Sequence, residues 1–325
     1  NNDNFISGFS RVALNTNVSN CSGCFFGCDH VFNTREIFKK LITNKDIDYK
    51  KNLILKKFLL RNDVIELEFD NSNNEKISTK KLFIGAGAIS TPKIILNSIK
   101  TKKNLEIKES QGFYIPCIYF GKNFNNVENY HTLSQGNILF KKNLKNNIGK
   151  IHYEIKYDPK LTQISLKKQL NFLHYFIPNF IKKRIFIVTG FINSEHSTYD
   201  AEINSSDFSL KIIKHKDKTK KIIEEISSQL SLLGSIYKFI SLKFFLKMGN
   251  FGRAFHLGSS IPMKSDYEIK KINDDRLISK SSGELKDFKN IYIIDSTNFP
   301  NIPSGSSSLT IMANAMRIGK ENTND

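Results

Sequence analysis

The stretch LFIGAGAISTPKIILNS, residues 82–98, decides the fold that this sequence predicts. A short apolar run passes through the small residues 85–88 and continues into a helical pattern. Ser90 or Thr91 can cap this helix, and Pro92 is tolerated in its first turn. Strand, small-residue turn and helix N-terminus in this order are typical of a nucleotide-facing crossover in an α/β sheet. Tight packing of the strand against the helix explains the small residues about as well.

A related pattern lies near the C-terminus, in IYIIDSTNFPNIPSGSSSLTIMA, residues 291–313. Its apolar run reads as a buried strand that delivers Asp295 to its carboxyl end, where α/β sheets place ligands. A loop of Gly, Ser and Pro then leads into a helix expected from about Leu309 to Ile318. The N-terminus of this helix can face a flavin ring oxygen or a diphosphate, because its free N–H groups and its dipole favour negative charge.

A third stretch, FHLGSSIPM at residues 255–263, carries the best candidate for acid–base chemistry. His256 is followed by small residues, which suits the floor of a cleft, and the ordinary pKa of a histidine lies near working pH. Out of context, a hydrogen-bonded structural histidine is the more common role for such a residue.

Between about residues 109 and 250 the pattern becomes β-rich, with polar connections. The strands expected there are residues 113–120, 136–141, 150–157, 184–192 and 208–214. They predict a largely antiparallel layer inserted into the α/β part. Residues 219–248 are expected to form one or two helices that break at Gly234. Upstream, residues 53–69 predict two strands around a turn at 61–63.

Taken together, in this order and spacing, the three stretches resemble the glucose–methanol–choline family of FAD-dependent oxidoreductases. Residues 82–98 look like its second signature, residues 255–263 are similar to its catalytic-histidine segment, and residues 291–313 look like its closing segment. The resemblance covers the chain from about residue 5 to the C-terminus.

The resemblance implies an α/β fold, in which a Rossmann-like FAD-binding domain is interrupted by a substrate-binding domain built on an antiparallel sheet. The FAD-binding domain is expected at residues 1–108 and 251–325, and the substrate-binding domain at residues 109–250. The activity that the resemblance implies is oxidation of a CH–OH group of an alcohol or sugar by hydride transfer to FAD. His256 would be the base that takes the hydroxyl proton.

The resemblance also implies where the cofactor lies. The FAD contacts that it assigns are Asp295 and Ser296 at the diphosphate–ribityl region, Ala86 and Gly87 near the adenosine half, and Leu309 and Thr310 at the isoalloxazine. Ser306 stands where the family usually carries a His or Asn that assists the base. A serine hydroxyl can hydrogen-bond an alkoxide but cannot share its proton as an imidazole does.

The glycine fingerprint that seats the FAD diphosphate in this family is absent. No G-x-G-x-x-G occurs in the chain, and Ser90 stands where Gly85 and Gly87 would need a third glycine. We therefore expect a fragment or a split gene, with a separate amino-terminal polypeptide carrying the fingerprint, and poor FAD binding by this polypeptide alone. A truncated or catalytically inactive relative is the alternative.

Three cysteines form a second candidate feature. Cys21, Cys24 and Cys28 have ligand-like spacing beside Asp29 and His30, which would suit zinc or an iron–sulfur cluster. Binding a metal is thus an alternative function for this segment. We expect instead that the segment binds no metal and forms a loop of small residues packed near the flavin. Four cysteines in 325 residues are too few for a disulfide scaffold, so we expect reduced thiols and a cytoplasmic protein.

The net charge of +18 does not predict a nucleic-acid partner. It comes from lysines spread along the whole chain, with only seven arginines, whereas base readers concentrate arginine. The longest apolar stretch, residues 230–248, is interrupted by three lysines and is too polar to span a bilayer. The expected partner is a small-molecule alcohol or sugar.

Overall fold

The computed structural model describes residues 3–9, 34–70, 77–99, 104–122, 136–141, 144, 151–156, 167, 175–271 and 276–323. These residues form two compact units, each assembled from three separate segments of the chain. The sheet unit takes the described residues within 1–49, 112–192 and 217–249. The crossover unit takes those within 50–111, 193–216 and 250–325. Each unit therefore brings together residues that are far apart in the sequence.

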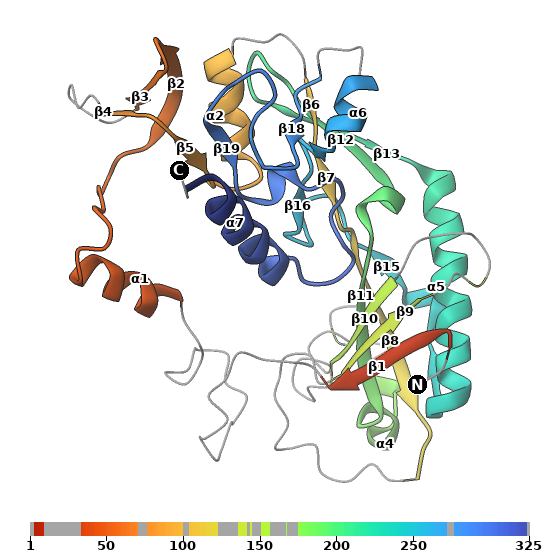
Figure 1. Cartoon of the computed structure of the whole chain (residues 1–325). Coiled ribbons are helices and arrows are strands. Elements are labelled where there is room, and N and C mark those ends of the chain that lie inside the picture. Colours follow the sequence, from red (N-terminus) through yellow and green to blue (C-terminus); the bar gives the residue numbers. More distant parts are fainter. Residues whose placement is uncertain are drawn as a thin grey trace. The chain divides into compact units, whose positions relative to one another are not determined.

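The sheet unit is built on an antiparallel sheet of seven described strands (Figure 1). Their order is β1 (Phe5–Phe9), β9 (Gly136–Phe140), β10 (Ile151–Lys156), β11 (Ile185–Ile192), β8 (Gly112–Tyr119) and β14 (Phe239–Ser241), with β15 (Lys247–Met248) also paired to β8. In β11 buried and half-buried residues alternate along most of the strand, because successive side chains point to opposite faces. The antiparallel layer predicted from the β-rich pattern is confirmed for these strands.

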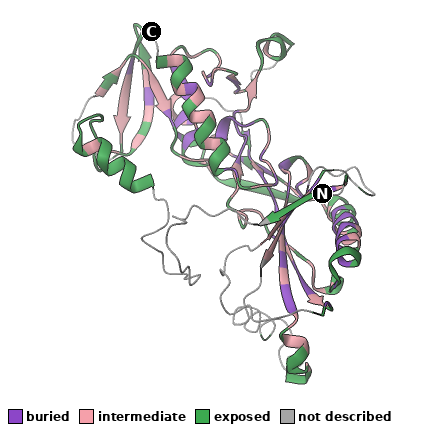
Figure 2. Cartoon of the chain, turned by 60° about the horizontal axis from the view of Figure 1, so that its bottom comes forward, coloured by how far each residue is buried: buried purple, intermediate pink, exposed green. Residues whose placement is uncertain are grey.

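Helix α5 (Lys216–Tyr237) covers the sheet with one apolar side. Ile222, Ile226, Leu230 and Leu233 recur at helical spacing, and they share a buried cluster with side chains of the sheet such as Tyr153. Figure 2 shows these buried residues along the helix in purple. The core of this unit therefore lies between α5 and the sheet.

The helix prediction for residues 219–248 was wrong at its end. Helix α5 runs through Gly234 to Tyr237, and residues 239–248 form β14, a 3-10 turn η3 (Lys243–Phe245) and β15. A Cβ at Gly234 would lie 2.4 Å from the backbone oxygen of Phe239. The glycine thus permits a close approach of the returning chain rather than a helix break.

The crossover unit contains a parallel strand pair, β5 (Leu82–Ile84) and β19 (Ile291–Ile293). Ile84, Ile291 and Ile293 share a buried cluster with the apolar side of α2 (Ser90–Ile99). Phe83 and Tyr292 alternate with these residues and stack with ring centroids 4.8 Å apart, so they occupy the opposite face. The sequence pattern predicted both strands and the helix that follows each of them.

The other sheets of the crossover unit are small. They are the hairpin β2 (Leu55–Arg61) and β3 (Val64–Phe69) with β4 (Ile77–Thr79), the sheet β6 (Leu105–Glu106), β12 (Tyr199–Ile203) and β13 (Leu210–Lys214), and the pairs β7 (Lys108–Glu109) with β16 (Leu257–Gly258) and β17 (Met263–Lys264) with β18 (Ser279–Lys280). Asn62 and Asp63 turn the hairpin with φ of 47° and 63°, as a tight primed turn requires. The predicted hairpin is confirmed.

The remaining described helices are short, apart from the last. They are α1 (Thr34–Thr43), α4 (Asn179–Lys182), η2 (Ser194–His196), α6 (Asp266–Lys271), η4 (Ser296–Asn298) and α7 (Ser308–Thr323). The helix expected at 309–318 is thus α7, which extends five residues further.

The compact units do not follow the domain ranges expected from the sequence. Strand β1 belongs to the sheet unit because it pairs with β9, although residues 1–108 were expected in the FAD-binding domain. Strands β12 and β13 belong to the crossover unit because β12 pairs with β6, although they lie within 109–250. The assignment of FAD and substrate to particular ranges stays a prediction.

Candidate functional site

The carboxylate of Asp295 joins the ends of the two parallel strands. Its Oδ2 accepts hydrogen bonds from the backbone N–H of Gly87 at 2.8 Å and from the hydroxyl of Thr91 at 2.6 Å. Its Oδ1 accepts from the N–H of Thr297 at 2.9 Å, and the Thr91 oxygen accepts from the N–H of Ala86 at 3.0 Å. Asp295 is 8% exposed. One buried carboxylate therefore fixes the small-residue turn after β5 against the turn after β19.

The turn after β5 keeps an open side. Gly85 and Ala86 are exposed, and a Cβ placed on Gly87, whose φ is +98°, would meet no heavy atom within 4 Å. The left-handed backbone at Gly87 favours glycine, and the open space leaves the backbone accessible to a ligand. This turn and the Asp295 carboxylate are the parts of the unit best suited to hold a nucleotide cofactor.

The histidine segment lies directly against the turn η4. The hydroxyl of Ser296 donates to the carbonyl of Leu257 at 2.7 Å, and the N–H of Ser259 donates to the carbonyl of Ser296 at 2.8 Å. The N–H of Ile261 continues the ladder to the carbonyl of Thr297 at 2.9 Å. His256 itself is half-buried. The structure thus brings the histidine segment and the Asp295 turn together.

Gly258 is the point of closest approach between these segments. A Cβ on it would lie 2.3 Å from the backbone oxygen of Ser296 and 2.8 Å from the Ser296 Cβ. No side chain fits there without moving one backbone away from the other.

Replacing Gly258 by alanine is therefore expected to push the histidine segment off η4 and to lower the free energy of unfolding by about 1–3 kcal/mol, the usual cost of overpacking. Urea unfolding followed by circular dichroism measures this loss. Gly319→Ala is the matched control, because a Cβ on Gly319 in α7 meets no atom within 4 Å. Equal stability of the two variants would contradict the close approach.

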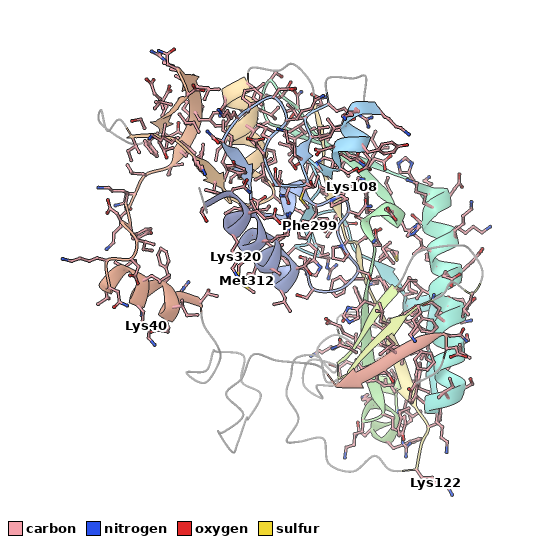
Figure 3. All side chains as sticks on the ribbon, in the orientation of Figure 1. Lys40, Lys108, Lys122, Phe299, Met312 and Lys320 are labelled. Carbon is pink, nitrogen blue, oxygen red and sulfur yellow. The ribbon has the colours of Figure 1, made fainter. Side chains whose placement is uncertain are left out.

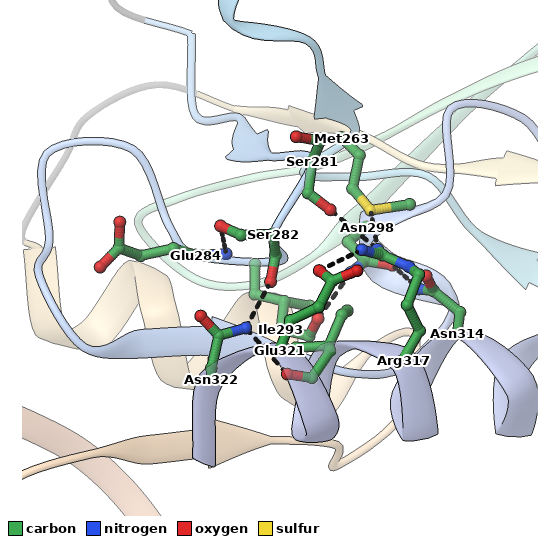
Figure 4. A network of polar contacts seen from close by, with 11 residues as sticks. Met263, Ser281, Ser282, Glu284, Ile293, Asn298, Asn314, Arg317, Glu321 and Asn322 are labelled. Atoms are coloured by element: carbon green, nitrogen blue, oxygen red, sulfur yellow. Dashed lines mark hydrogen bonds and ion pairs between the residues drawn. The ribbon is translucent and has the colours of Figure 1, made fainter. Parts of the chain in front are cut away.

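Helix α7 is tied to the same turn by a polar network (Figure 4). Asn314 donates from Nδ2 to Oδ1 of Asn298 at 3.3 Å, and Asn298 donates from its own Nδ2 to the carbonyl of Ile293 at 2.5 Å. Arg317 donates to Oδ1 of Asn314 at 3.0 Å and to the carbonyl of Ser281 at 2.8 Å. Helix α7 thus packs against the turn η4 that the histidine segment also contacts.

The start of α7 and the loop before it are exposed. Ser306 and Thr310 are exposed, and Leu309 has 74% of its surface in solvent. Met312 and Met316 continue an exposed apolar row along the helix, and Figure 3 labels Met312 on it. Contact of Ser306, Leu309 and Thr310 with a flavin stays a prediction.

Four residues of this arrangement escaped the sequence analysis. Thr91 was considered only as a helix cap, yet its hydroxyl bonds Asp295. Asn298 and Asn314 link η4 to α7, and Glu109 is 1% exposed and accepts two backbone hydrogen bonds. Thr91 and Glu109 have partners more than 100 residues away in the sequence. The local signal at these positions was a polar side chain within an apolar or small-residue stretch.

A cavity of about 470 Å³ lies in the crossover unit beside the histidine segment. Ser259, Ser260 and Pro262 line part of it, together with charged residues that include Glu106 and Arg276. None of the predicted site residues lines this cavity. It therefore adjoins the histidine segment without reaching the predicted site residues.

The predicted cysteine set, Cys21, Cys24 and Cys28, lies outside the described residues, so the metal-binding alternative stays a prediction. Among the residues that the structure describes, no group of three His, Cys, Asp or Glu side chains could hold a metal ion. No described helix is long and apolar enough to cross a membrane.

Comparison with known proteins finds likenesses in structure alone. No protein-family model matches the chain, and no curated protein matches its sequence. Among solved structures, the crystal structure of pyridoxine 4-oxidase from Mesorbium loti matches with a TM-score of 0.47 and 9% sequence identity. The match covers 83% of this chain and 57% of that chain, so this chain spans little more than half of the oxidase's length.

Proposed function

We propose that this chain is the larger part of an FAD-dependent oxidoreductase that oxidises a CH–OH group of an alcohol or sugar. The observation that carries the proposal is that the small-residue turn after β5 and the histidine segment, both remote in sequence, meet the turn at Asp295 and η4. Asp295 bonds the N–H of Gly87 across 208 residues of chain. Parallel β5 and β19 both end at this point. Ligands of α/β sheets bind at the carboxyl ends of parallel strands.

The residues present fit an FAD molecule in two respects. The backbone at Ala86 and Gly87 is open, which lets a planar or phosphorylated group approach closely. The Asp295 carboxylate has about four acceptor positions, of which the chain's own donors use three, so one is left for a ribityl or ribose hydroxyl. Ser296 extends the same turn. Leu309 and Thr310, at the exposed start of α7, would approach the ring system.

The bound flavin supplies the hydride acceptor. His256 acts as the base that takes the proton of the substrate hydroxyl, and an imidazole is suited to this because its pKa lies near neutral pH. Ser306 donates a hydrogen bond to the substrate oxygen from the loop before α7. We place this activity in the cytoplasm.

A separate polypeptide is part of the proposal. The chain holds no G-x-G-x-x-G, so the FAD diphosphate lacks its usual glycine-rich seat. We infer that a strand–turn–helix polypeptide with this fingerprint completes the FAD site.

The test is the visible absorbance spectrum of the purified protein. It is recorded for the chain as given and for the chain produced together with whatever coding sequence precedes residue 1, each incubated with FAD and desalted. Flavin bands retained by the longer form alone support the proposal. Retention by neither form, and by neither when a separate polypeptide with the fingerprint is produced alongside it, would overturn the proposal in favour of an inactive relative. An iron–sulfur shoulder without flavin would favour the cysteine module.

A further inference from the structure

Glu109 is a buried carboxylate that the proposed mechanism does not use. It ends β7 and is 1% exposed. Its Oε2 accepts the backbone N–H of Gly252 at 2.9 Å, and its Oε1 accepts the N–H of Ala254 at 3.0 Å. Burial raises the pKa of Glu109 above its ordinary value, and the two backbone hydrogen bonds oppose this rise. Burying a carboxyl group is unfavourable in free energy unless the group is hydrogen-bonded, and the two hydrogen bonds to one loop offset this penalty for Glu109.

That loop leads directly into His256. Glu109 lies opposite Leu257 in the β7–β16 pair, and the N–H of Ser110 donates to the carbonyl of His256 at 3.0 Å. The side chain of Glu109 therefore fixes the loop at Gly252 and Ala254, before His256. The backbone of Glu109 and Ser110 fixes the loop at His256 and Leu257. One short strand secures both ends of the histidine loop, residues 252–257.

The histidine loop needs such restraint because its backbone is strained. Phe255, within the loop, has a φ of 59°, in the left-handed region that residues other than glycine and asparagine rarely adopt. Ser259, two residues beyond the loop, has a φ of 62°. Phe255 is 88% exposed, so burial of its ring does not hold the loop. Strained conformations persist only where surrounding contacts determine them, and they gather at functional sites.

We infer that Glu109 is a positioning residue for His256. It holds the histidine loop in its strained conformation through Gly252 and Ala254, and so sets the place and orientation of the imidazole without touching substrate or flavin. The catalytic meaning of this inference rests on the proposed function, in which His256 is the base. The positioning itself is a property of this chain.

The first test needs no flavin. The imidazole signals of isotope-labelled protein are recorded by NMR, with the His256 signal identified by its loss in His256→Gln. Glu109→Ala is expected to shift the His256 signal and to speed hydrogen exchange of the Gly252 and Ala254 amides at least about 10-fold, since their acceptor is gone. The matched control is Glu106→Ala, an exposed glutamate three residues earlier. An unmoved His256 signal in folded Glu109→Ala overturns the inference.

A second variant covers the case in which Glu109→Ala does not fold. Glu109→Gln keeps the volume and one acceptor oxygen, so it is expected to release one of the two amides and to move the His256 signal by a smaller amount. Full protection of both amides together with an unmoved His256 signal contradicts the inference as well.

The flavin-loaded protein separates this inference from the proposed function. Glu109→Gln is expected to slow flavin reduction about 10-fold while FAD affinity stays within about twofold, because a misplaced base loses rate and not cofactor binding. If His256→Ala leaves flavin reduction unchanged while Glu109→Ala still shifts the His256 signal, the proposed function fails and the positioning stands. If His256→Ala slows reduction but neither Glu109 variant does, the positioning role in catalysis fails.

Discussion

Replacing His256 by alanine is expected to slow reduction of the bound flavin by an alcohol substrate about 100-fold or more, the usual contribution of a general base. The reason is that the substrate hydroxyl keeps its proton unless a positioned base removes it as hydride leaves. Stopped-flow absorbance of the flavin bands measures the rate, in the form of the protein that retains FAD. FAD affinity should not change, because His256 is assigned to the substrate and not to the cofactor.

His215→Ala is the matched control for this prediction. His215 lies in the same compact unit, and its Nε2 is 2.6 Å from Oδ2 of Asp200 near β12 and β13, away from the three motifs. Its loss should leave flavin reduction near the wild-type rate. Equal rates for the His256 and His215 variants would remove His256 from the role of base.

The second large effect is expected at Asp295. Alanine at this position leaves the N–H of Gly87, the hydroxyl of Thr91 and the N–H of Thr297 without their acceptor. Thr91 and Thr297 are fully buried, and each buried donor left unpaired costs about 1–3 kcal/mol, so the free energy of unfolding should fall by about 2 kcal/mol or more. Urea unfolding of the apoprotein, with no flavin present, measures this.

Two further variants sharpen the Asp295 prediction. Asp295→Asn keeps one carbonyl acceptor and should lose less stability than alanine. Asp207→Ala removes an exposed carboxylate that accepts hydrogen bonds from its near neighbour Ser209, so the urea midpoint should move far less. If Asp295→Ala unfolds at the wild-type midpoint, its carboxylate is not the link between the two strand ends.

The local features of the fold could be predicted from the sequence where a pattern of residues is compatible with only one secondary structure. The turn at Asn62 and Asp63 between two apolar runs predicts a hairpin, because these residues tolerate left-handed backbone. Residues 239–248 mix apolar side chains with lysines at spacings that suit either helix or strand, so their return along β8 could not be read. Gly234 was predicted to break the helix, because in sequence a glycine that permits close approach of another backbone cannot be distinguished from a glycine that ends a helix.

The candidate site was predictable only as far as its motifs extend. The stretches around Gly87, His256 and Asp295 could be recognised because each is a continuous run. Glu109 could not, since its partner Gly252 is 143 residues away and only the folded chain shows that they meet. Buried hydrogen-bond partners are set by topology, and a single sequence does not record topology.

The division of each unit into three segments has a consequence for synthesis on the ribosome. A chain that has emerged through residue 249 contains every segment of the sheet unit, whereas the crossover unit still lacks β16, β19 and α7. Strand β5 therefore lacks its pairing partner β19 until more than 200 further residues have been synthesised. Such a waiting strand is exposed to misassociation, so chaperone dependence should reside in the crossover unit, and the bond between Gly87 and Asp295 should be among the last to form.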